Sequence, residues 1–127
     1  MKKQATSGSP FENSIGFCRA TRIGNIVAVS GTAPINFDGS TAHVGDVYGQ
    51  TKVCLDIIKE AIQRVDGRFT DIIRTRIFLK DISQWEKAAK AHGEYFSEIK
   101  PVCTFVEVSR FIDEDWLVEI EADCVVH

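Results

Sequence analysis

Residues 47–82 have the sequence VYGQTKVCLDIIKEAIQRVDGRFTDIIRTRIFLKDI, and the spacing of their apolar side chains changes partway along. The first part repeats at the three- and four-residue spacing of one helical face, and Gly67 supplies a stop signal. The helical face consists of Val47, Thr51, Cys54, Leu55, Ile58, Ala61, Ile62 and Val65. The second part alternates, with Ile73, Thr75, Ile77 and Leu79 on one side. This stretch therefore predicts a helix followed by a strand.

A second helix is predicted after this strand, with Ser83 and Glu86 as a capping box at its start. Its inner face would carry Trp85, Ala88, Ala89, His92 and Phe96. Pro101 ends that segment, and residues 102–108 and 116–126 are predicted strands. Residues 24–35, GNIVAVSGTAPI, predict a further strand that stops at Ser30-Gly31.

Two amphipathic helices and about five strands predict a two-layer α+β sandwich with both helices on one face of a mixed sheet. Residues 1–14 are polar and contain Gly8 and Pro10, so we expect a flexible N-terminal arm there. Residues 15–127 would then form a single domain, because nothing in them resembles a linker or a repeat.

The sheet face away from the helices is predicted to carry charge. Glu119, Glu121 and Asp123 share one side of the last strand, and the predicted face also holds Arg74 and Arg76. We expect Cys103, Phe105 and Phe78 on this face as well. Such a surface is either a solvated charge ladder or, given its aromatic residues, the contact face of a symmetric oligomer.

Composition excludes several classes of protein. The chain has 127 residues, 44% of them hydrophobic, and a net charge of −3, which argues against a nucleic-acid coat or a membrane-surface protein. No apolar run is long enough to span a bilayer and no secretory signal is evident, so a cytoplasmic protein is expected. The four cysteines are far apart in sequence, with no metal-ligand spacing, and are expected to be reduced thiols.

Five segments in order resemble the RidA/YjgF family, also labelled endoribonuclease L-PSP, over residues 16–126. They are SGTAPI, GQTKVCLDIIKEAI, DIIRTRIFLKDISQWEKAAKAHGEYF, KPVCTFVEVSR and LVEIEAD. The resemblance implies a chorismate-mutase-like fold and a homotrimer with a small-molecule ligand in each inter-subunit cleft. It also implies cofactor-free hydrolysis of reactive imines and enamines, such as 2-aminoacrylate, to oxo acids and ammonia.

The resemblance assigns roles to a few positions. Glu119 matches the glutamate that holds the attacking water, and this role is favoured; the alternative is that Glu119 is one more member of the charge ladder. Gly31 matches a glycine whose backbone approaches the ligand, with Ser30 beside it; a structural turn explains Gly31 nearly as well.

The chain departs from the RidA pattern at Cys103, where the family has an arginine that binds the substrate's α-carboxylate. Thr104 follows it. The family's cleft tyrosine falls near Phe17 or Cys18, and its asparagine early in the second helix matches Ala89. We expect Phe17, Cys103 and Thr104 to line the cleft. Cys103 would be a small neutral lining residue or, if His92 acted as its base, a nucleophile.

These departures leave two questions open. Arg19, Arg22 and Arg110 are the candidates to replace the missing arginine. By the resemblance Arg110 matches a structural arginine of the family, and the positions of Arg19 and Arg22 cannot be inferred from sequence. The function would be hydrolysis of an imine that lacks the usual carboxylate contact, with a non-catalytic ligand-binding trimer as the alternative. An endoribonuclease is a weaker alternative, because the chain has no basic stripe with stacking aromatic residues.

Overall fold

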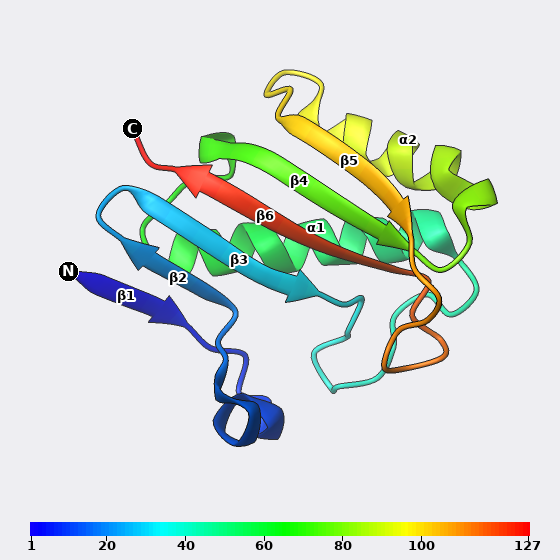
Figure 1. Ribbon diagram of the computed structural model, residues 1–127, viewed down its shortest axis with the longest axis horizontal. Helices are drawn as coiled ribbons and strands as arrows, with labels where there is room; N and C mark the ends of the chain where they lie inside the picture. The colour runs from blue at the N-terminus through cyan, green and yellow to red at the C-terminus, as the bar shows by residue number, and fades with distance from the viewer.

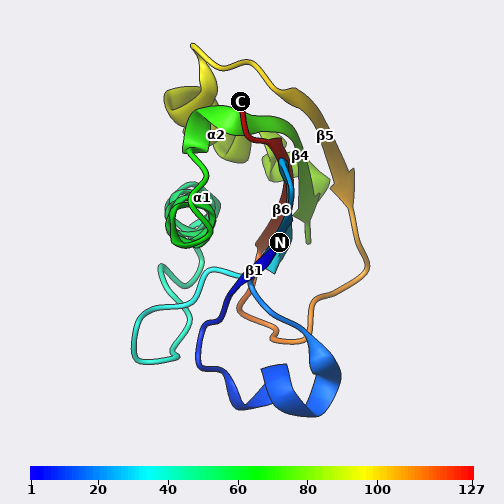
Figure 2. The same ribbon diagram turned by 90° about the vertical axis from the view of Figure 1, so that its left-hand side faces the viewer.

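The computed structural model describes residues 1–127. One mixed sheet of six strands has the order β1-β2-β3-β6-β4-β5. Both α-helices lie on the same face of this sheet, as Figure 1 shows from the front and Figure 2 from the side. The predicted α+β sandwich is confirmed. The elements are β1 (Lys2–Ala5), η1 (Glu12–Gly16), β2 (Ala20–Ile23), β3 (Ile26–Thr32), α1 (Val47–Arg64), η2 (Phe69–Asp71), β4 (Ile72–Leu79), η3 (Ile82–Gln84), α2 (Trp85–Phe96), β5 (Val102–Glu107) and β6 (Val118–Val125).

Helix α1 buries the face that its sequence spacing predicted. Leu55, Ile58 and Ile62 are fully buried, in one hydrophobic core with residues of β3, β4 and β6. The helix begins after Asp46, whose carboxylate accepts a hydrogen bond from the Gly49 N–H at 3.0 Å. This N-cap satisfies one of the backbone donors that the first turn leaves free.

The sheet is antiparallel except for one pair. Strands β4 and β5 run parallel and are connected through η3 and α2, as a parallel pair requires. Strand β6 lies between β3 and β4, so its residues are in the middle of the sheet. No helix of the structure combines the length and the apolar content needed to cross a membrane.

The first 14 residues differ from the flexible arm expected for them. Lys2–Ala5 form strand β1, which pairs with β2 at the edge of the sheet. Residues 12–16 form the turn η1, and Glu12 is buried there because its carboxylate accepts a hydrogen bond from the Ser7 N–H at 2.7 Å. The short polar sequence of β1 has no apolar alternation, so its pattern did not predict a strand.

Two local expectations were wrong. Ile73 does not belong to the buried face of β4, because the register shifts between Ile72 and Arg74, and Ile73 is 51% exposed. Ile72 is buried in its place. Ser83 does not cap the second helix: it lies in η3, where its N–H donates to Asp81.

Candidate active site

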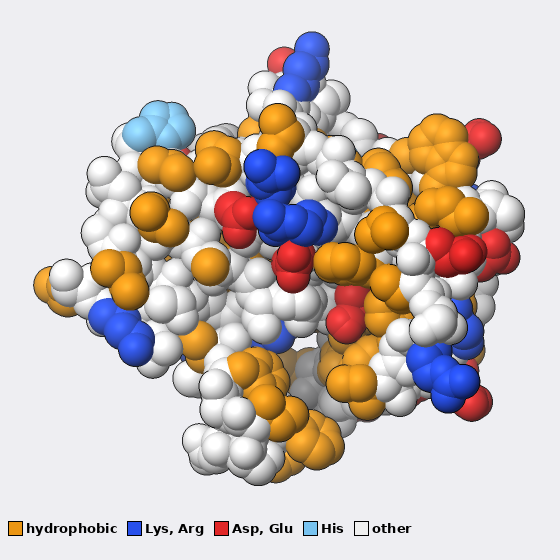
Figure 3. Space-filling model, viewed as in Figure 1, with side chains coloured by type: hydrophobic (Ala, Val, Ile, Leu, Met, Phe, Trp, Pro, Cys, Tyr) orange, Lys and Arg blue, Asp and Glu red, His pale blue; other side chains and the backbone are white.

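The acidic side chains of β6 lie on the sheet face that no helix covers, as the alternation predicted. Arg76 pairs with two of them, its Nη1 lying 3.2 Å from Glu121 Oε1 and 3.2 Å from Asp123 Oδ2. These paired charges gather in the middle of the face in Figure 3. Glu119 has neither an ion pair nor a hydrogen bond from another protein group. Of the three carboxylates it is the one left free for a ligand or a water.

The surroundings of Glu119 favour its protonated form relative to a glutamate in water. Burial raises the pKa of its carboxyl group, the positive charge of Arg19 lowers it, and the negative charge of Glu121 raises it further. A carboxylate whose pKa is shifted toward neutrality is a better proton acceptor when ionised. The Glu119 carboxylate, without a protein partner and with a raised pKa, is therefore able to accept a proton from a bound group.

Because Gly31 has no side chain, the space next to the Glu119 carboxylate stays open. Strand β3 has an irregular register against β6 between Val29 and Thr32, which places the backbone of Gly31 beside the carboxylate. A Cβ added at Gly31 would lie 3.6 Å from Glu119 Oε2. Any longer side chain at this position would therefore compete with a ligand of Glu119. Ser30 precedes it and donates its N–H to the carbonyl of Arg19 at 3.0 Å.

Arg19 joins this group of residues. Its guanidinium donates to the Gly31 carbonyl at 3.0 Å and to Thr32 Oγ1 at 3.3 Å, and it lies 5.6 Å from the centre of the Phe17 ring. Burial lowers the pKa of Arg19, while Glu12 and then Glu119 raise it. An arginine nevertheless stays charged in proteins. Its nitrogens lie more than 4.0 Å from the Glu119 oxygens, since the two residues form no ion pair.

The surface is hollowed on the open face of the sheet, close to η1. Figure 3 shows the hollow directly above the η1 turn, bordered by hydrophobic side chains on the η1 side. A cavity of about 540 Å³ is lined by residues between Gln4 and Thr21; it shares Phe17 with this group, and its lining includes neither Arg19 nor Glu119. The predicted residues Phe17, Ser30, Gly31 and Glu119 thus lie together, and Arg19 is added to them.

Cys103 and Phe105 are on the other face of the sheet, contrary to the expectation. Cys103 is in parallel register with Thr75, so both side chains point to the helix side. Phe105 contacts α2 there, with its ring 6.1 Å from that of Trp85. Thr104 points the opposite way and is in register with Arg76 on the open face. One chain therefore cannot bring Cys103 to the same ligand as Glu119.

Thr75 and His92 lie next to Cys103. Thr75 Oγ1 is 2.9 Å from His92 Nε2, and Thr75 is fully buried. Burial lowers the pKa of His92 from 6.5 to about 4, so its ring is neutral at pH 7. Burial raises the pKa of the Cys103 thiol, and a hydrogen bond with Thr75 lowers it. Because the net shift is upward, the thiol is protonated at neutral pH, which does not favour a nucleophilic cysteine.

The neutral His92 gives a testable pH dependence of stability. Its pKa is lower in the folded state than in the unfolded one, so the unfolded state takes up a proton first as the pH falls. Stability from His92 is thus complete above pH 6.5 and is lost toward pH 4. The urea midpoint of the wild type should fall more between these pH values than that of a His92→Gln variant. The exposed His43, changed to Asn, is the control and should keep the wild-type decrease. Equal decreases in wild type and His92→Gln would contradict this account.

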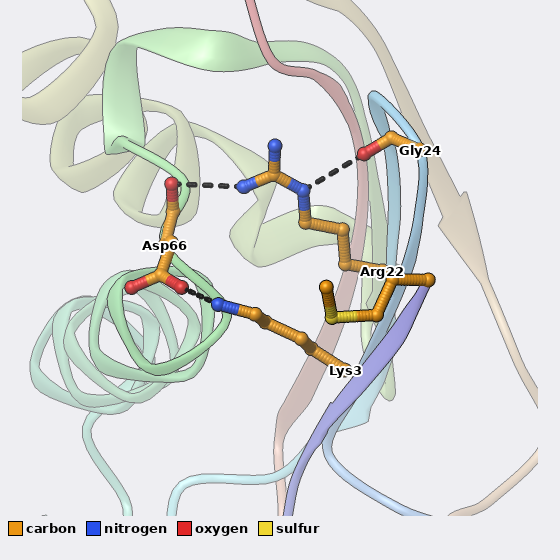
Figure 4. Close-up of a pocket in the computed structure, with 5 residues that line it drawn as sticks. Lys3, Arg22, Gly24 and Asp66 are labelled. Atoms are coloured by element: carbon orange, nitrogen blue, oxygen red, sulfur yellow. Dashed lines mark hydrogen bonds and ion pairs between the residues drawn. The ribbon is translucent and has the colours of Figure 1, made fainter.

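The other two candidate arginines are elsewhere. Arg22 donates to the carbonyls of Gly24 and Asp66 at the end of α1, in the pocket that Figure 4 shows. That pocket has a volume of about 280 Å³, and an ion pair between Lys3 and Asp66 closes one side of it. Arg110 is exposed in the loop after β5. No group of three or more His, Cys, Asp or Glu side chains is placed to hold a metal ion.

A side-chain contact that the sequence did not reveal holds the start of β6. The buried Gln50 of α1 donates to the Asp115 carbonyl at 2.9 Å and accepts from the Leu117 N–H at 2.8 Å. This side chain connects α1 to the loop that leads into β6. It thereby fixes the strand position from which Glu119 projects.

The chain is similar to known proteins over nearly its whole length. The family model described as endoribonuclease L-PSP matches residues 9–126. The 3-aminoacrylate deaminase RutC of Acinetobacter baylyi is 35% identical over 101 residues, which cover 80% of this chain and 79% of that protein. Rv2704 of Mycobacterium tuberculosis, a member of the YjgF/YER057c/UK114 family, has a structure with a TM-score of 0.90 and 37% identity, covering 99% of this chain and 100% of that one. The YjgF gene product of E. coli is 29% identical with a TM-score of 0.83, over 98% of each chain.

Proposed function

The chain belongs to the YjgF/YER057c/UK114 family, also called RidA or endoribonuclease L-PSP, and from this membership we propose that it hydrolyses a small imine or enamine to a carbonyl compound and ammonia. Glu119 would hold and deprotonate the attacking water. The observation that carries the proposal is that Glu119 is unpaired and half-buried, while the other two carboxylates of β6 are bound to Arg76. A cytoplasmic setting and a reaction without cofactor are part of the proposal.

The chemistry needs one proton acceptor and a held water. An enamine such as 3-aminoacrylate, the substrate in the name of the RutC relative, first takes a proton on carbon and loses one from nitrogen, which converts it to the imine. Water then loses a proton to Glu119 while its oxygen bonds to the imine carbon, and the C=N electron pair moves to nitrogen. The proton passes from Glu119 to that nitrogen. The hydroxyl proton of the resulting carbinolamine then moves to the amino nitrogen while the C–N bond breaks, which releases ammonia and leaves a C=O group.

We further propose that a second copy of the chain completes the cleft. Glu119 and Cys103 lie on opposite faces of one sheet, but β5 is an edge strand that a neighbouring copy can approach. In a symmetric ring of subunits, the Cys103 edge of one copy would face the Glu119 side of the next. The homotrimer that the family resemblance implies supplies such a ring, with one cleft for each pair of neighbours.

Ammonia release from 3-aminoacrylate and from 2-iminobutyrate, both generated in situ, tests the proposed reaction. The wild-type protein should accelerate release well above the spontaneous rate for at least one of them. Release at the spontaneous rate with both substrates would contradict the proposed hydrolysis. A trimer that binds small ligands without turnover would then be the better account.

A further inference from the structure

Arg19 is the positively charged group beside Glu119, and it has unused hydrogen-bond donors. A guanidinium carries five N–H groups, of which the contacts with Gly31 and Thr32 use two. The planar arrangement of the remaining donors suits the two oxygens of a carboxylate. The bonds to Gly31 and Thr32 and the Phe17 ring also restrain the side chain, so that little conformational entropy is lost when it binds an anion.

The Cys103 side of the proposed cleft has no comparable positive charge. Cys103 is a protonated thiol, and its near neighbours Thr75 and His92 are neutral at pH 7. Arg22 is at the far end of α1 (Figure 4), and Arg76 is occupied by Glu121 and Asp123. A substrate anion bound next to Glu119 would therefore have Arg19 as its cationic partner.

We infer that Arg19 binds the acidic group of the substrate, so that the substrate is a small anionic imine or enamine held from the Glu119 side of the cleft. The inference rests on the proposed function. It makes Arg19 a specificity-determining residue and replaces the expectation that this chain acts on substrates without a carboxylate contact. The carboxylate would be bound by the subunit that also activates the water.

The charges around Arg19 are compatible with a bound anion. The titratable groups that influence it are Glu12 of η1, Glu119 of β6, and the thiols of Cys18 and Cys54. The Glu12 carboxylate is held by Ser7, and neither it nor Glu119 forms an ion pair with Arg19. A carboxylate in direct contact with the guanidinium gains a charge-assisted hydrogen bond, whereas repulsion from the more distant carboxylates weakens with distance.

Binding of propionate, compared with its neutral isostere propionamide, tests the inference without turnover. Affinities are measured by NMR titration at pH 7 on the wild type and on Arg19→Gln, Arg19→Lys and Glu119→Gln. The control is Arg22→Gln, which removes an arginine of the remote pocket. Circular dichroism verifies that each variant is folded.

The wild type should bind propionate about tenfold or more tightly than propionamide, because the charge-assisted bonds are lost with the amide. Arg19→Gln should abolish this preference, Arg19→Lys should retain part of it, and Arg22→Gln should retain all of it. If Arg19→Gln fails to fold, an intermediate preference in Arg19→Lys still supports the inference. Equal affinities for the two ligands in wild type, or a full preference in Arg19→Gln, would overturn it.

The same variants, measured for ligand binding and for hydrolysis, distinguish a failure of this inference from a failure of the proposed function. Glu119→Gln should keep the preference for propionate, because it leaves Arg19 in place. An Arg19-dependent preference in a protein without hydrolytic activity would support the anion site and reject the proposed reaction. Hydrolysis that requires Glu119, together with a propionate preference that ignores Arg19, would reject the anion site alone.

Discussion

Replacing Glu119 with glutamine is expected to lower kcat/KM for imine hydrolysis by about two to four orders of magnitude, the usual contribution of a general base. Glutamine keeps the size of the side chain and can still hydrogen-bond a water, but it cannot accept the proton. The measurement is the initial rate of ammonia release over a range of substrate concentrations.

The matched control for this variant is Glu121→Gln. Glu121 is two residues further along the same face, but its carboxylate is bound to Arg76 at 3.2 Å. Its replacement should change the rate little. Similar losses in both variants would indicate that negative charge on the face, and not proton transfer at Glu119, supports the reaction.

The raised pKa of Glu119 also fixes the direction of the pH dependence. The carboxylate must be ionised to accept a proton, so kcat/KM should fall as the pH drops through its pKa. Burial raises this pKa, so the fall should be centred above the ordinary range of a glutamate. The positive charge of Arg19 lowers the pKa of Glu119, so the Arg19→Gln variant should lose kcat/KM at a still higher pH.

The sequence predicted correctly those helices and strands whose apolar residues recur at a regular spacing. The buried stripe of α1 and the alternation of β6 are each repeated over several turns or residue pairs, and the structure has both. The placement of the acidic residues on one face followed from that alternation, and the structure adds their ion pairs with Arg76. Glu119 was accordingly placed on the correct face.

The sequence did not predict the structure correctly where the regular spacing of apolar residues is interrupted or weak. An extra residue near Ile73 shifts the register of β4, so the buried face that runs through Thr75, Ile77 and Leu79 continues to Ile72 and not to Ile73. Strand β5 has apolar or small residues on both faces, so its alternation could not show that Cys103 and Phe105 point toward α2. Strand β1 depends on pairing with β2, which its own four residues do not reveal.

The sequence predicted only part of the candidate site. Phe17, Ser30, Gly31 and Glu119 were identified from the family resemblance, and they lie together. The position of Arg19 depends on the irregular backbone of β3, which places the Gly31 carbonyl within its reach. No periodic pattern encodes that contact, and Arg19 could not be distinguished from Arg22 by sequence.

Restoration of activity in mixed assemblies is the second large effect that we expect. Glu119→Gln removes the base from every cleft, and Cys103→Trp fills the opposite wall of every cleft with a large ring. Each variant alone should be nearly inactive. In a ring built from both variants, one cleft combines the intact Glu119 of one copy with the intact Cys103 of its neighbour.

The most direct test of the account is therefore the rate of ammonia release by the two variants produced together in equal amounts. We predict about a quarter of the wild-type rate, since about three in four random trimers are mixed and each has one intact cleft. Mixing the separately assembled variants without subunit exchange should restore nothing and is the control. No restoration after joint production, or full activity of Cys103→Trp alone, would contradict a catalytic cleft shared between two copies of the chain.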